Sequence, residues 1–282
     1  MRAVPAEISR ESKPGTFERV RDFVAASIDS AHASDEPFHH LVLGPVFPAD
    51  VYDAMQSAMP VASNYRAMSG RSKSNRRADG TPTRVKMDLF PEYIRHLPPE
   101  MRGVWDIVGS ALCSDEVRQA FVRRLAHGLR RRFGSDFAST RMYPIPILTR
   151  DVPGYLIKPH TDTRWKGITV QIYLPSDDAH PGIGTIFHER KPEGGLAKKT
   201  QMRFVPNSGY AFAVGDDTWH SADPVGPEVA SRDSILLTYF VDSGVVLHLR
   251  NRIKRAGNFL ANELRYASRP WRRPPTDKPP HG

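Results

Sequence analysis

The segment PGYLIKPHTDTRWKGITVQIYLP, residues 153–175, holds two short runs of apolar and β-branched residues, Tyr155–Lys158 and Ile168–Leu174, on either side of a polar turn. Such runs, bounded by Pro and Gly, are typical of β-strands. Five further runs of this kind occur in the same half of the chain: Thr140–Leu148, Thr185–His188, Met202–Val205, Tyr210–Val214 and Ser234–Val241. Seven short strands that follow a helical half predict a mainly β sandwich or barrel buttressed by helices.

The half of the chain before this segment has the spacing of helices. Apolar residues recur at helical intervals over 17–28, and the pattern resumes over 49–59. A longer helical region is predicted over about 99–133, broken near Ser114, a residue that suits a helix N-cap. Between the first two helices, residues 38–48 predict a strand that runs into a turn.

No internal repeat and no domain linker interrupts these elements, so we predict a single domain of the size of an enzyme. The domain is expected at 16–264, preceded by a disordered N-terminus at 1–15 and followed by a basic Pro-rich tail at 265–282. Within the domain we expect a helical part at 16–134, a β-rich core at about 135–245 and a C-terminal helix at about 246–264.

Positive charge is concentrated in two parts of the chain. The 282 residues hold 40 Lys and Arg against 31 Asp and Glu, a net charge of +9. Residues 250–282 carry nine of these basic residues and two of the acidic ones, and their proline-rich end predicts a solvated tail. The second basic stretch, residues 66–86, predicts a long mobile loop.

Both basic stretches are expected to be solvated surface. The alternative is that the loop covers a site and supplies cations to an anionic substrate from four arginines: Arg71, Arg76, Arg77 and Arg84.

Several classes of protein are excluded by what the sequence lacks. The single cysteine, Cys113, rules out an intramolecular disulfide framework and a Cys-rich zinc module. The first residues lack the apolar region of a signal peptide, and no stretch of about 18 apolar residues could span a membrane. We therefore expect a soluble, cytoplasmic protein with no membrane partner.

Three side chains in the β-rich half form a candidate metal site. His160 and Asp162 are two residues apart at the end of a strand, so both point to one face, and His220 lies 60 residues later. Two imidazoles and one carboxylate leave coordination positions open, which suits Fe(II). His188 is an alternative third ligand, but no Arg-x-Ser follows it at a suitable distance. The pair 39–40, both histidines, lacks a nearby carboxylate in a strand-like arrangement and is expected to be structural.

Arg232 and Ser234 come twelve and fourteen residues after His220 and share one face of an apolar strand. An arginine with a hydroxyl two residues further on suits the binding of a carboxylate. The alternative for Arg232 is a surface ion pair with Asp233 or Glu228.

This ordered set of motifs resembles that of the Fe(II)/2-oxoglutarate-dependent oxygenases. The likeness covers about residues 140–242 and extends beyond the candidate ligands to Pro153-Gly154-Tyr155-x-Ile157-x-Pro159-His160-x-Asp162, Lys166, Thr169, Tyr173-Leu174-Pro175, Gly184-Thr185 and Pro206-Asn207. The segment Glu36–Leu43 also resembles the opening strand of prolyl-hydroxylase-like members. The resemblance implies a double-stranded β-helix, that is, a cupin-like jelly-roll core.

The same resemblance implies roles for individual residues. His160, Asp162 and His220 are expected to bind iron. Arg232 with Ser234 is expected to anchor 2-oxoglutarate, with Tyr143 as a further contact. Halogenating relatives have Gly or Ala in place of the carboxylate ligand, so Asp162 favours hydroxylation. Four side chains close to the metal motif in sequence or beside His220 are expected to meet the substrate: Tyr155, Lys158, Arg164 and Trp219.

The resemblance therefore implies an Fe(II)-dependent dioxygenase that consumes 2-oxoglutarate and O₂. It is expected to hydroxylate an unactivated C–H bond of a small molecule, such as an amino acid or an anionic derivative of one, with release of succinate and CO₂. Two alternatives stay open: a prolyl-type protein hydroxylase, and a cupin-like metal enzyme that uses no 2-oxoglutarate. A non-catalytic jelly roll that binds nucleic acid through its basic tail is disfavoured by the intact ligand set. No residue pattern specifies an oligomeric state.

Overall fold

The computed structural model describes residues 16–68 and 76–242, together with seven helical residues between 257 and 267. The chain divides into two compact units, Met1–Ser243 and Gly244–Gly282. The predicted disordered segment 1–15 lies outside the described residues, as do most of the predicted helix at 246–264, most of the tail and the middle of the basic stretch 66–86. Among the described helices, none combines the length and the apolar character needed to cross a membrane.

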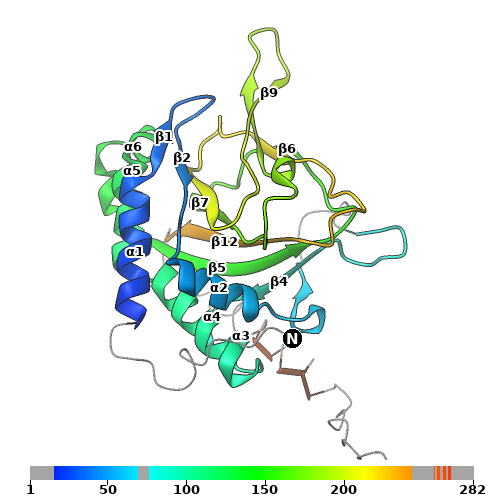
Figure 1. The fold of residues 1–282 in the computed structure, drawn as a ribbon. Helices are drawn as coiled ribbons and strands as arrows, with labels where there is room; N and C mark the ends of the chain where they lie inside the picture. Colours follow the sequence, from blue (N-terminus) through cyan, green and yellow to red (C-terminus); the bar gives the residue numbers. More distant parts are fainter. Residues whose placement is uncertain are drawn as a thin grey trace, which may run out of the picture. The chain divides into compact units, whose positions relative to one another are not determined.

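Two antiparallel sheets form the centre of the first unit (Figure 1). The four central strands of the larger, eight-stranded sheet have the order β5-β12-β7-β10, and the smaller sheet has the order β6-β11-β8-β9. Because the chain passes from one sheet to the other and back, this is the topology of a jelly roll, and the predicted fold class is confirmed. The strands span β5 Met142–Asp151, β6 Ile157–His160, β7 Lys166–Tyr173, β8 Ile186–Arg190, β9 Leu196–Gln201, β10 Ser208–Ala213, β11 His220–Ala222 and β12 Arg232–Val241.

Four more strands extend the larger sheet at its two edges. Strands β1 (His32–Ser34) and β2 (His40–Leu43) continue it beyond β10, and β4 (Arg84–Asp88) and β3 (Arg66–Ala67) continue it beyond β5. The prediction of a mobile loop over 66–86 is therefore wrong at both of its ends. In β4 the charged residues alternate with apolar ones that pack against the core, which is the two-residue period of a strand.

Helices cover the outer face of the larger sheet (Figure 1). The helices span α1 Thr16–Ser30, α2 Ala49–Ser57, α3 Pro91–Ile94, α4 Pro99–Leu112, α5 Asp115–Arg124 and α6 Ala126–Phe133, and the 3₁₀ turns span η2 Ala62–Asn64, η4 Ser135–Ser139 and η5 Pro181–Ile183. The predicted break at Ser114 is confirmed, since the Ser114 hydroxyl accepts a hydrogen bond from the Val117 N–H at 3.4 Å. The region predicted as two helices contains a third, because the chain turns again at Leu125.

The two faces of β12 have different surroundings. Ile235, Leu237 and Tyr239 are fully buried in one apolar cluster with Val20 of α1 and Trp105 of α4. Since side chains alternate along a strand, the other face of β12 points into the space between the two sheets. That face carries Arg232, Ser234 and Thr238, so the predicted carboxylate-binding pair lies inside the jelly roll.

Candidate metal centre and cosubstrate site

The structure brings the three predicted metal ligands together. His160 ends β6 and His220 begins β11, and the two residues are direct partners in the register of this strand pair. Their ring centroids are 4.3 Å apart. Asp162 follows two residues after His160, and one ligand atom from each of the three side chains lies within 4.8 Å of the others.

Backbone carbonyls determine which nitrogen of each imidazole is free. The Nδ1 of His160 lies 3.0 Å from the carbonyl oxygen of Lys158, and the Nδ1 of His220 lies 3.0 Å from that of Thr218. A carbonyl oxygen only accepts, so each Nδ1 carries the proton and donates. Each Nε2 therefore keeps its lone pair for a metal, in the arrangement by which ligand histidines are oriented in metal sites.

Burial keeps both imidazoles neutral. It lowers the pKa of His220 to about 4 and lowers the pKa of His160 as well. Burial acts in the opposite sense on Asp162, but the Lys166 ammonium and the hydrogen bonds from Lys166 and Thr169 help to outweigh it, and the pKa of that carboxyl falls below its usual range. At neutral pH the three side chains thus offer two neutral nitrogens and one carboxylate.

Two neighbours hold the Asp162 carboxylate in place. The Lys166 ammonium donates to Oδ1 and the Thr169 hydroxyl donates to Oδ2, both at 2.6 Å. Both residues belong to β7, the strand that follows the His-x-Asp turn. The sequence motif contained Lys166 and Thr169 but gave them no role, and the structure shows that they orient the carboxylate.

This donor set fits Fe(II). Two imidazole nitrogens and one carboxylate oxygen on one side of a site are the ligands of non-haem iron oxygenases, and they leave positions open for other ligands. The tautomers and charges described above are those that a divalent metal requires, because ligand nitrogens must be unprotonated and the carboxylate ionised.

Arg232 is buried and does not form the alternative surface ion pair. Its Nη2 donates to the Asp151 carboxylate at 2.9 Å and its Nη1 donates to the Ile183 carbonyl at 2.7 Å. Asp233 instead accepts from Arg150, with the closest contact at 2.7 Å. The ion-pair alternative for Arg232 with Asp233 or Glu228 is therefore wrong.

A second arginine reaches the same carboxylate. Arg84 of β4 donates to both Asp151 oxygens, at 2.5 and 2.7 Å. The Asp151 side chain is completely buried. Two guanidinium groups thus share one buried carboxylate, and the group carries a net positive charge. A buried excess charge of this kind is costly unless an anion compensates it.

Tyr155 lies beside these two arginines. The guanidinium carbon of Arg84 is 4.1 Å from the centroid of its ring, and that of Arg232 is 5.3 Å away. The Tyr155 side chain is fully buried and, within the part of the chain that the structure describes, its hydroxyl has no hydrogen-bond partner. Burial raises its pKa to about 12, so the hydroxyl stays a donor at neutral pH. A donor without an acceptor next to an excess positive charge fits the carboxylate of a ligand.

Ser234 takes part in a buried network. Its hydroxyl accepts from the Gln171 amide at 3.0 Å and lies 2.9 Å from the Thr149 hydroxyl. The Gln171 side chain in turn accepts from the Tyr210 hydroxyl at 2.9 Å. These polar groups lie inside the jelly roll and hydrogen-bond to one another. Ser234 thereby links β12 to its two neighbouring strands, β5 and β7.

The other predicted site residues lie in different places. Tyr143 pairs in register with Phe240 and stacks on its ring, with centroids 5.8 Å apart. Phe240 lies eight positions further along β12 than Arg232, or about 26 Å at a rise of about 3.3 Å per residue, so the structure does not bring Tyr143 to Arg232. Lys158 is exposed.

Arg164 and Trp219 lie near the candidate metal ligands in sequence and differ in exposure. The exposed Arg164 pairs with Asp216 at 3.4 Å. Trp219 is half-buried, and its indole N–H has no partner among the described residues. The guanidinium of Arg190 lies over the Trp219 ring, 5.4 Å from its centroid.

A cavity of about 730 Å³ reaches Asp162, the candidate carboxylate ligand. Four arginines line it: Arg131, Arg132, Arg164 and Arg190. Of these, Arg132 donates to the carbonyl groups of Lys166, Arg164 and Val214. Sequence reasoning missed the three arginines other than Arg164. The run Arg130–Arg132 at the end of α6 was the available signal, but its position beside Asp162 depends on the fold.

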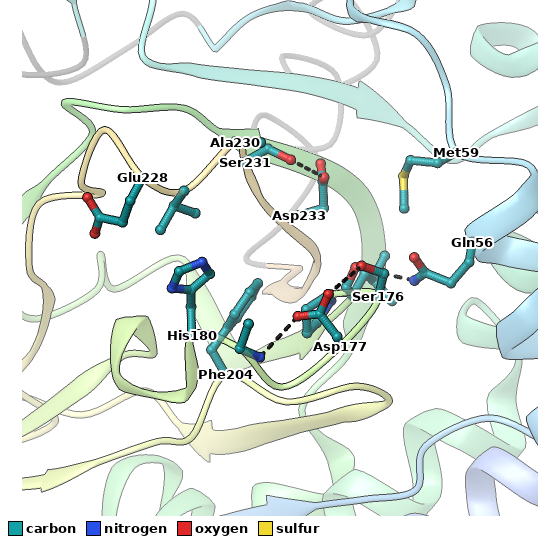
Figure 2. A pocket seen from close by; sticks show the side chains of 14 residues that line it. Gln56, Met59, Ser176, Asp177, His180, Phe204, Glu228, Ala230, Ser231 and Asp233 are labelled. Carbon is teal, nitrogen blue, oxygen red and sulfur yellow. Dashed lines mark hydrogen bonds between the residues drawn. The ribbon is translucent and has the colours of Figure 1, made fainter.

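A second cavity, of about 330 Å³, is shown in Figure 2. It includes none of the three candidate metal ligands and is lined by three carboxylates, those of Asp177, Glu228 and Asp233, and by His180. The dashed lines in Figure 2 show that Asp177 and Asp233 already accept hydrogen bonds from neighbours, with Ser231 donating to Asp233 at 2.7 Å.

No protein-family model matches this chain, and no curated protein matches it. Among solved structures, a prolyl-4-hydroxylase from Pseudomonas putida is similar with 17% identity and a TM-score of 0.48, over 77% of this chain and 98% of that one. A prolyl hydroxylase from Trichoplax adhaerens, in complex with a peptide fragment of the hypoxia inducible factor oxygen degradation domain, has 10% identity and a TM-score of 0.48, over 83% of this chain and 96% of that one. The non-heme alpha ketoglutarate dependent epimerase SnoN from nogalamycin biosynthesis has 13% identity and a TM-score of 0.40, over 81% of this chain and 84% of that one.

Proposed function

We propose that this chain is an Fe(II)/2-oxoglutarate-dependent oxygenase that hydroxylates a C–H bond of a small anionic molecule. The observation that carries the proposal is the convergence of His160, Asp162 and His220, with each Nδ1 next to a backbone carbonyl oxygen. This arrangement supplies the ligand types, charges and orientation that such an iron site needs.

The residues of this centre have separate tasks. The two Nε2 atoms and the Asp162 carboxylate bind the metal, while Thr169 keeps the carboxylate oriented. In the metal-free protein Lys166 neutralises Asp162. When bound, iron(II) supplies the redox chemistry in which 2-oxoglutarate and O₂ give succinate and CO₂ while a substrate C–H bond is hydroxylated.

The buried arginines are suited to the cosubstrate. 2-Oxoglutarate carries a carboxylate distant from its keto acid, and the Arg84–Asp151–Arg232 group has one positive charge in excess. We assign Arg232, Arg84 and the Tyr155 hydroxyl to that distal carboxylate. Asp151 holds the two guanidinium groups side by side. Charge-assisted hydrogen bonds of this kind are stronger than those between neutral groups.

The cavity beside Asp162 supports an anionic substrate. Its arginines exceed its carboxylates even before a metal neutralises Asp162, since Asp162, Asp216 and Asp217 stand against four guanidinium groups. Arg76 and Arg77, the described arginines of the basic stretch that stay on the surface, donate to the backbone carbonyls of Gly80 and Pro153. We therefore expect Arg164 and Arg190 of the cavity, rather than the arginines of the basic stretch 66–86, to pair with the negative charge of the substrate. Contacts of Lys158 and Trp219 with the substrate stay predictions.

The test is an anaerobic titration of metal-free protein with Fe(II) and 2-oxoglutarate. A chelated keto acid on iron(II) gives a visible charge-transfer band, which we expect for the wild type and not for His160→Ala. Arg232→Ala should give the band only at higher 2-oxoglutarate concentrations. His180→Ala, which removes a histidine of the cavity in Figure 2, serves as the control and should leave the band unchanged. Absence of the band at saturating 2-oxoglutarate would refute the proposal.

A further inference from the structure

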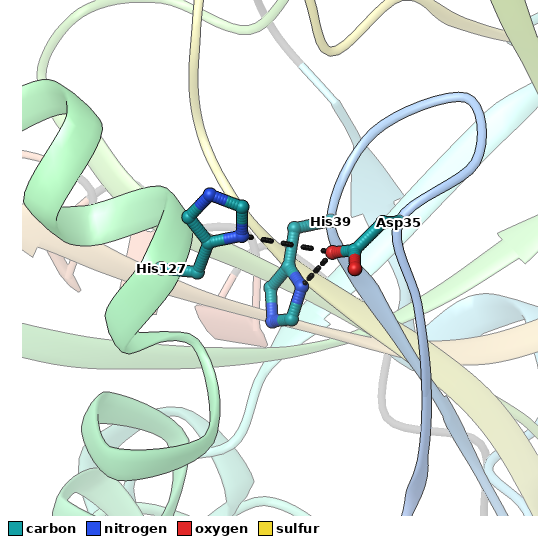
Figure 3. Close-up of side chains that lie close together, drawn as sticks. All are labelled: Asp35, His39 and His127. Atoms are coloured by element: carbon teal, nitrogen blue, oxygen red, sulfur yellow. Dashed lines mark hydrogen bonds and ion pairs between the residues drawn. The ribbon is translucent and has the colours of Figure 1, made fainter.

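A second group of potential metal ligands lies apart from the centre described above. Asp35 and His39 belong to the segment between β1 and β2, and His127 lies in the first turn of α6 (Figure 3). One ligand atom from each of these side chains lies within 4.8 Å of the others. The expectation that the histidine pair 39–40 has no carboxylate nearby is wrong, because the chain bends between Asp35 and His39 and places the carboxylate beside the ring.

The hydrogen bonds of His39 call for a cation at this point. Its Nε2 lies 3.2 Å from the Arg124 carbonyl oxygen, which only accepts, so Nε2 carries a proton. Its Nδ1 lies 2.7 Å from the Asp35 carboxylate. An unprotonated Nδ1 would face an oxygen anion with its lone pair. A metal ion bound to both atoms would remove this conflict while Nε2 still donates to the Arg124 carbonyl.

We propose that Asp35, His39 and His127 form a second divalent-metal site, of the kind that binds Zn²⁺. Nitrogen and oxygen donors from two imidazoles and one carboxylate suit zinc, with a water molecule in the fourth position. The Arg124 carbonyl would fix the tautomer of His39, as the Lys158 carbonyl does for His160.

The geometry is close to that of a zinc site. The Asp35 oxygen lies 2.7 Å from Nδ1 of His39 and 3.6 Å from Nδ1 of His127. Two ligands of a tetrahedral zinc with bonds of about 2.0–2.1 Å are separated by about 3.3 Å, which falls between these distances. The two rings are inclined at 63° with centroids 5.3 Å apart, and Figure 3 shows both turned towards the carboxylate.

A metal here would connect two parts of the fold that are distant in sequence. It would tie the segment before β2 to α6, and His39 also lines the cavity that reaches Asp162. The side chains of Asp35 and His127 are 75% and 60% exposed, so the ion would exchange with solvent. The expected role is to fix one wall of that cavity, and it does not depend on the reaction proposed above.

The experiment uses the full-length chain carrying His160→Ala and His220→Ala, which removes the first metal centre. Titration with Zn²⁺ against a chelating dye should give one ion per chain, and Zn²⁺ should raise the Tm by a few degrees because it binds only the folded chain. Adding His127→Ala should weaken Zn²⁺ binding at least about tenfold and abolish the rise in Tm. Asp35→Asn, also at an exposed position, should act in the same way.

The control is His32→Ala, which removes an exposed histidine of β1. It should leave both the affinity and the Tm shift unchanged. If the background variant binds no Zn²⁺, or if His127→Ala and Asp35→Asn bind it as the background variant does, the site is an ion pair between protonated His39 and Asp35 and the proposal fails. Equal losses in His127→Ala and His32→Ala would mean scattered binding to surface histidines and would also overturn it.

Discussion

Arg84 and Arg232 are paired in register with the same residue, Asp151, from the two strands that flank β5. The strand order β12-β5-β4 therefore places two guanidinium groups on either side of one buried carboxylate. Asp151 alone cannot neutralise both arginines. The pairing of strands thus leaves one positive charge in excess inside the jelly roll, and we propose that a carboxylate of 2-oxoglutarate compensates it.

Replacing Arg84 by Met tests the role of this excess charge. Arg84→Met leaves a balanced pair of Asp151 and Arg232, and the Met side chain still covers the ring of Tyr155. We expect the free energy of unfolding to change by no more than about 1 kcal/mol, because a balanced pair remains. The dissociation constant for 2-oxoglutarate should rise at least about tenfold, the loss of one charge-assisted hydrogen bond.

The measurement for Arg84→Met is the anaerobic titration with 2-oxoglutarate, combined with urea unfolding of the metal-free protein. Arg76→Met removes an exposed arginine that donates to the Gly80 carbonyl, and it should leave 2-oxoglutarate binding unchanged. If both variants bind 2-oxoglutarate with equal affinity, Arg84 does not contact the cosubstrate.

Two tyrosines with unpartnered hydroxyls allow a matched comparison. Tyr155 and Tyr239 are both fully buried, and neither hydroxyl has a hydrogen-bond partner among the described residues. Tyr155 lies beside the arginine pair, whereas Tyr239 packs against the helices on the other face of β12. Removing a buried hydroxyl that lacks a partner is expected to be neutral or to stabilise the metal-free protein by up to about 1 kcal/mol.

Both Tyr155→Phe and Tyr239→Phe should therefore preserve or raise the free energy of unfolding, measured by urea denaturation. Only Tyr155→Phe should also weaken 2-oxoglutarate binding, by about fivefold to thirtyfold for the loss of about 1–2 kcal/mol. A loss of 2-oxoglutarate affinity of the same size in Tyr239→Phe would mean that the effect is a general one on the fold.

Much of the metal centre could be predicted from local sequence. The two-residue period of a strand places His160 and Asp162 on one face, and the order of motifs identified His220 over His188. In the structure His188 is buried and bonds the Ser221 hydroxyl at 2.7 Å. The convergence of these three side chains could be predicted because it depends on strand periodicity and on the spacing of the motifs along the chain.

The strands of the smaller sheet were harder to predict. A strand was expected at Met202–Val205, but these residues have no regular structure and the preceding segment, Leu196–Gln201, forms β9. Met202 and Phe204 are apolar because they pack in the cluster around Phe187, whereas the exposed hairpin strand β9 has little apolar character. In this segment the apolar residues therefore mark buried positions and do not mark the strand.

The role of Arg84 could not be predicted for a different reason. Nothing in the local pattern of β4 specifies that it pairs with the outer side of β5, opposite Asp151. Its neighbours in sequence, rich in Gly, Ser and Pro, favoured a loop. Arg84 belongs to the site only through a pairing between segments 67 residues apart.

The stability of the sheet edge should depend on pH through Asp88. Its carboxylate is buried and pairs with Lys86 at 3.0 Å and Arg66 at 2.5 Å. Burial alone would raise the pKa of Asp88, but the two cations outweigh it and hold the pKa below its ordinary value. The folded chain therefore releases this proton more readily than the unfolded chain, whose aspartates have a pKa of about 3.9.

The contribution of the ionised Asp88 is thus complete above about pH 5 and is lost as the pH falls through the folded-state pKa. We expect Asp88→Asn to be less stable than wild type at pH 7, and the difference in the free energy of unfolding to shrink towards about pH 3. Urea unfolding at a series of pH values measures this difference. A gap that stays constant with pH would mean that Asp88 acts through packing rather than through its charge.

Thr169 provides a test of how Asp162, the proposed iron ligand, is oriented. Its hydroxyl donates to Asp162 at 2.6 Å, and its register partner across the sheet is Thr238, a buried threonine on the same interior face. Thr169→Val keeps the shape of the side chain and removes the hydrogen bond, so Fe(II) affinity should fall about tenfold to a hundredfold, as for other groups that hold metal ligands.

Thr238→Val makes the same change of hydroxyl to methyl without touching Asp162 and should leave Fe(II) affinity unchanged. Competition with a chelating dye measures both, and equal affinities in the two variants would show that Lys166 or the metal itself suffices to orient Asp162.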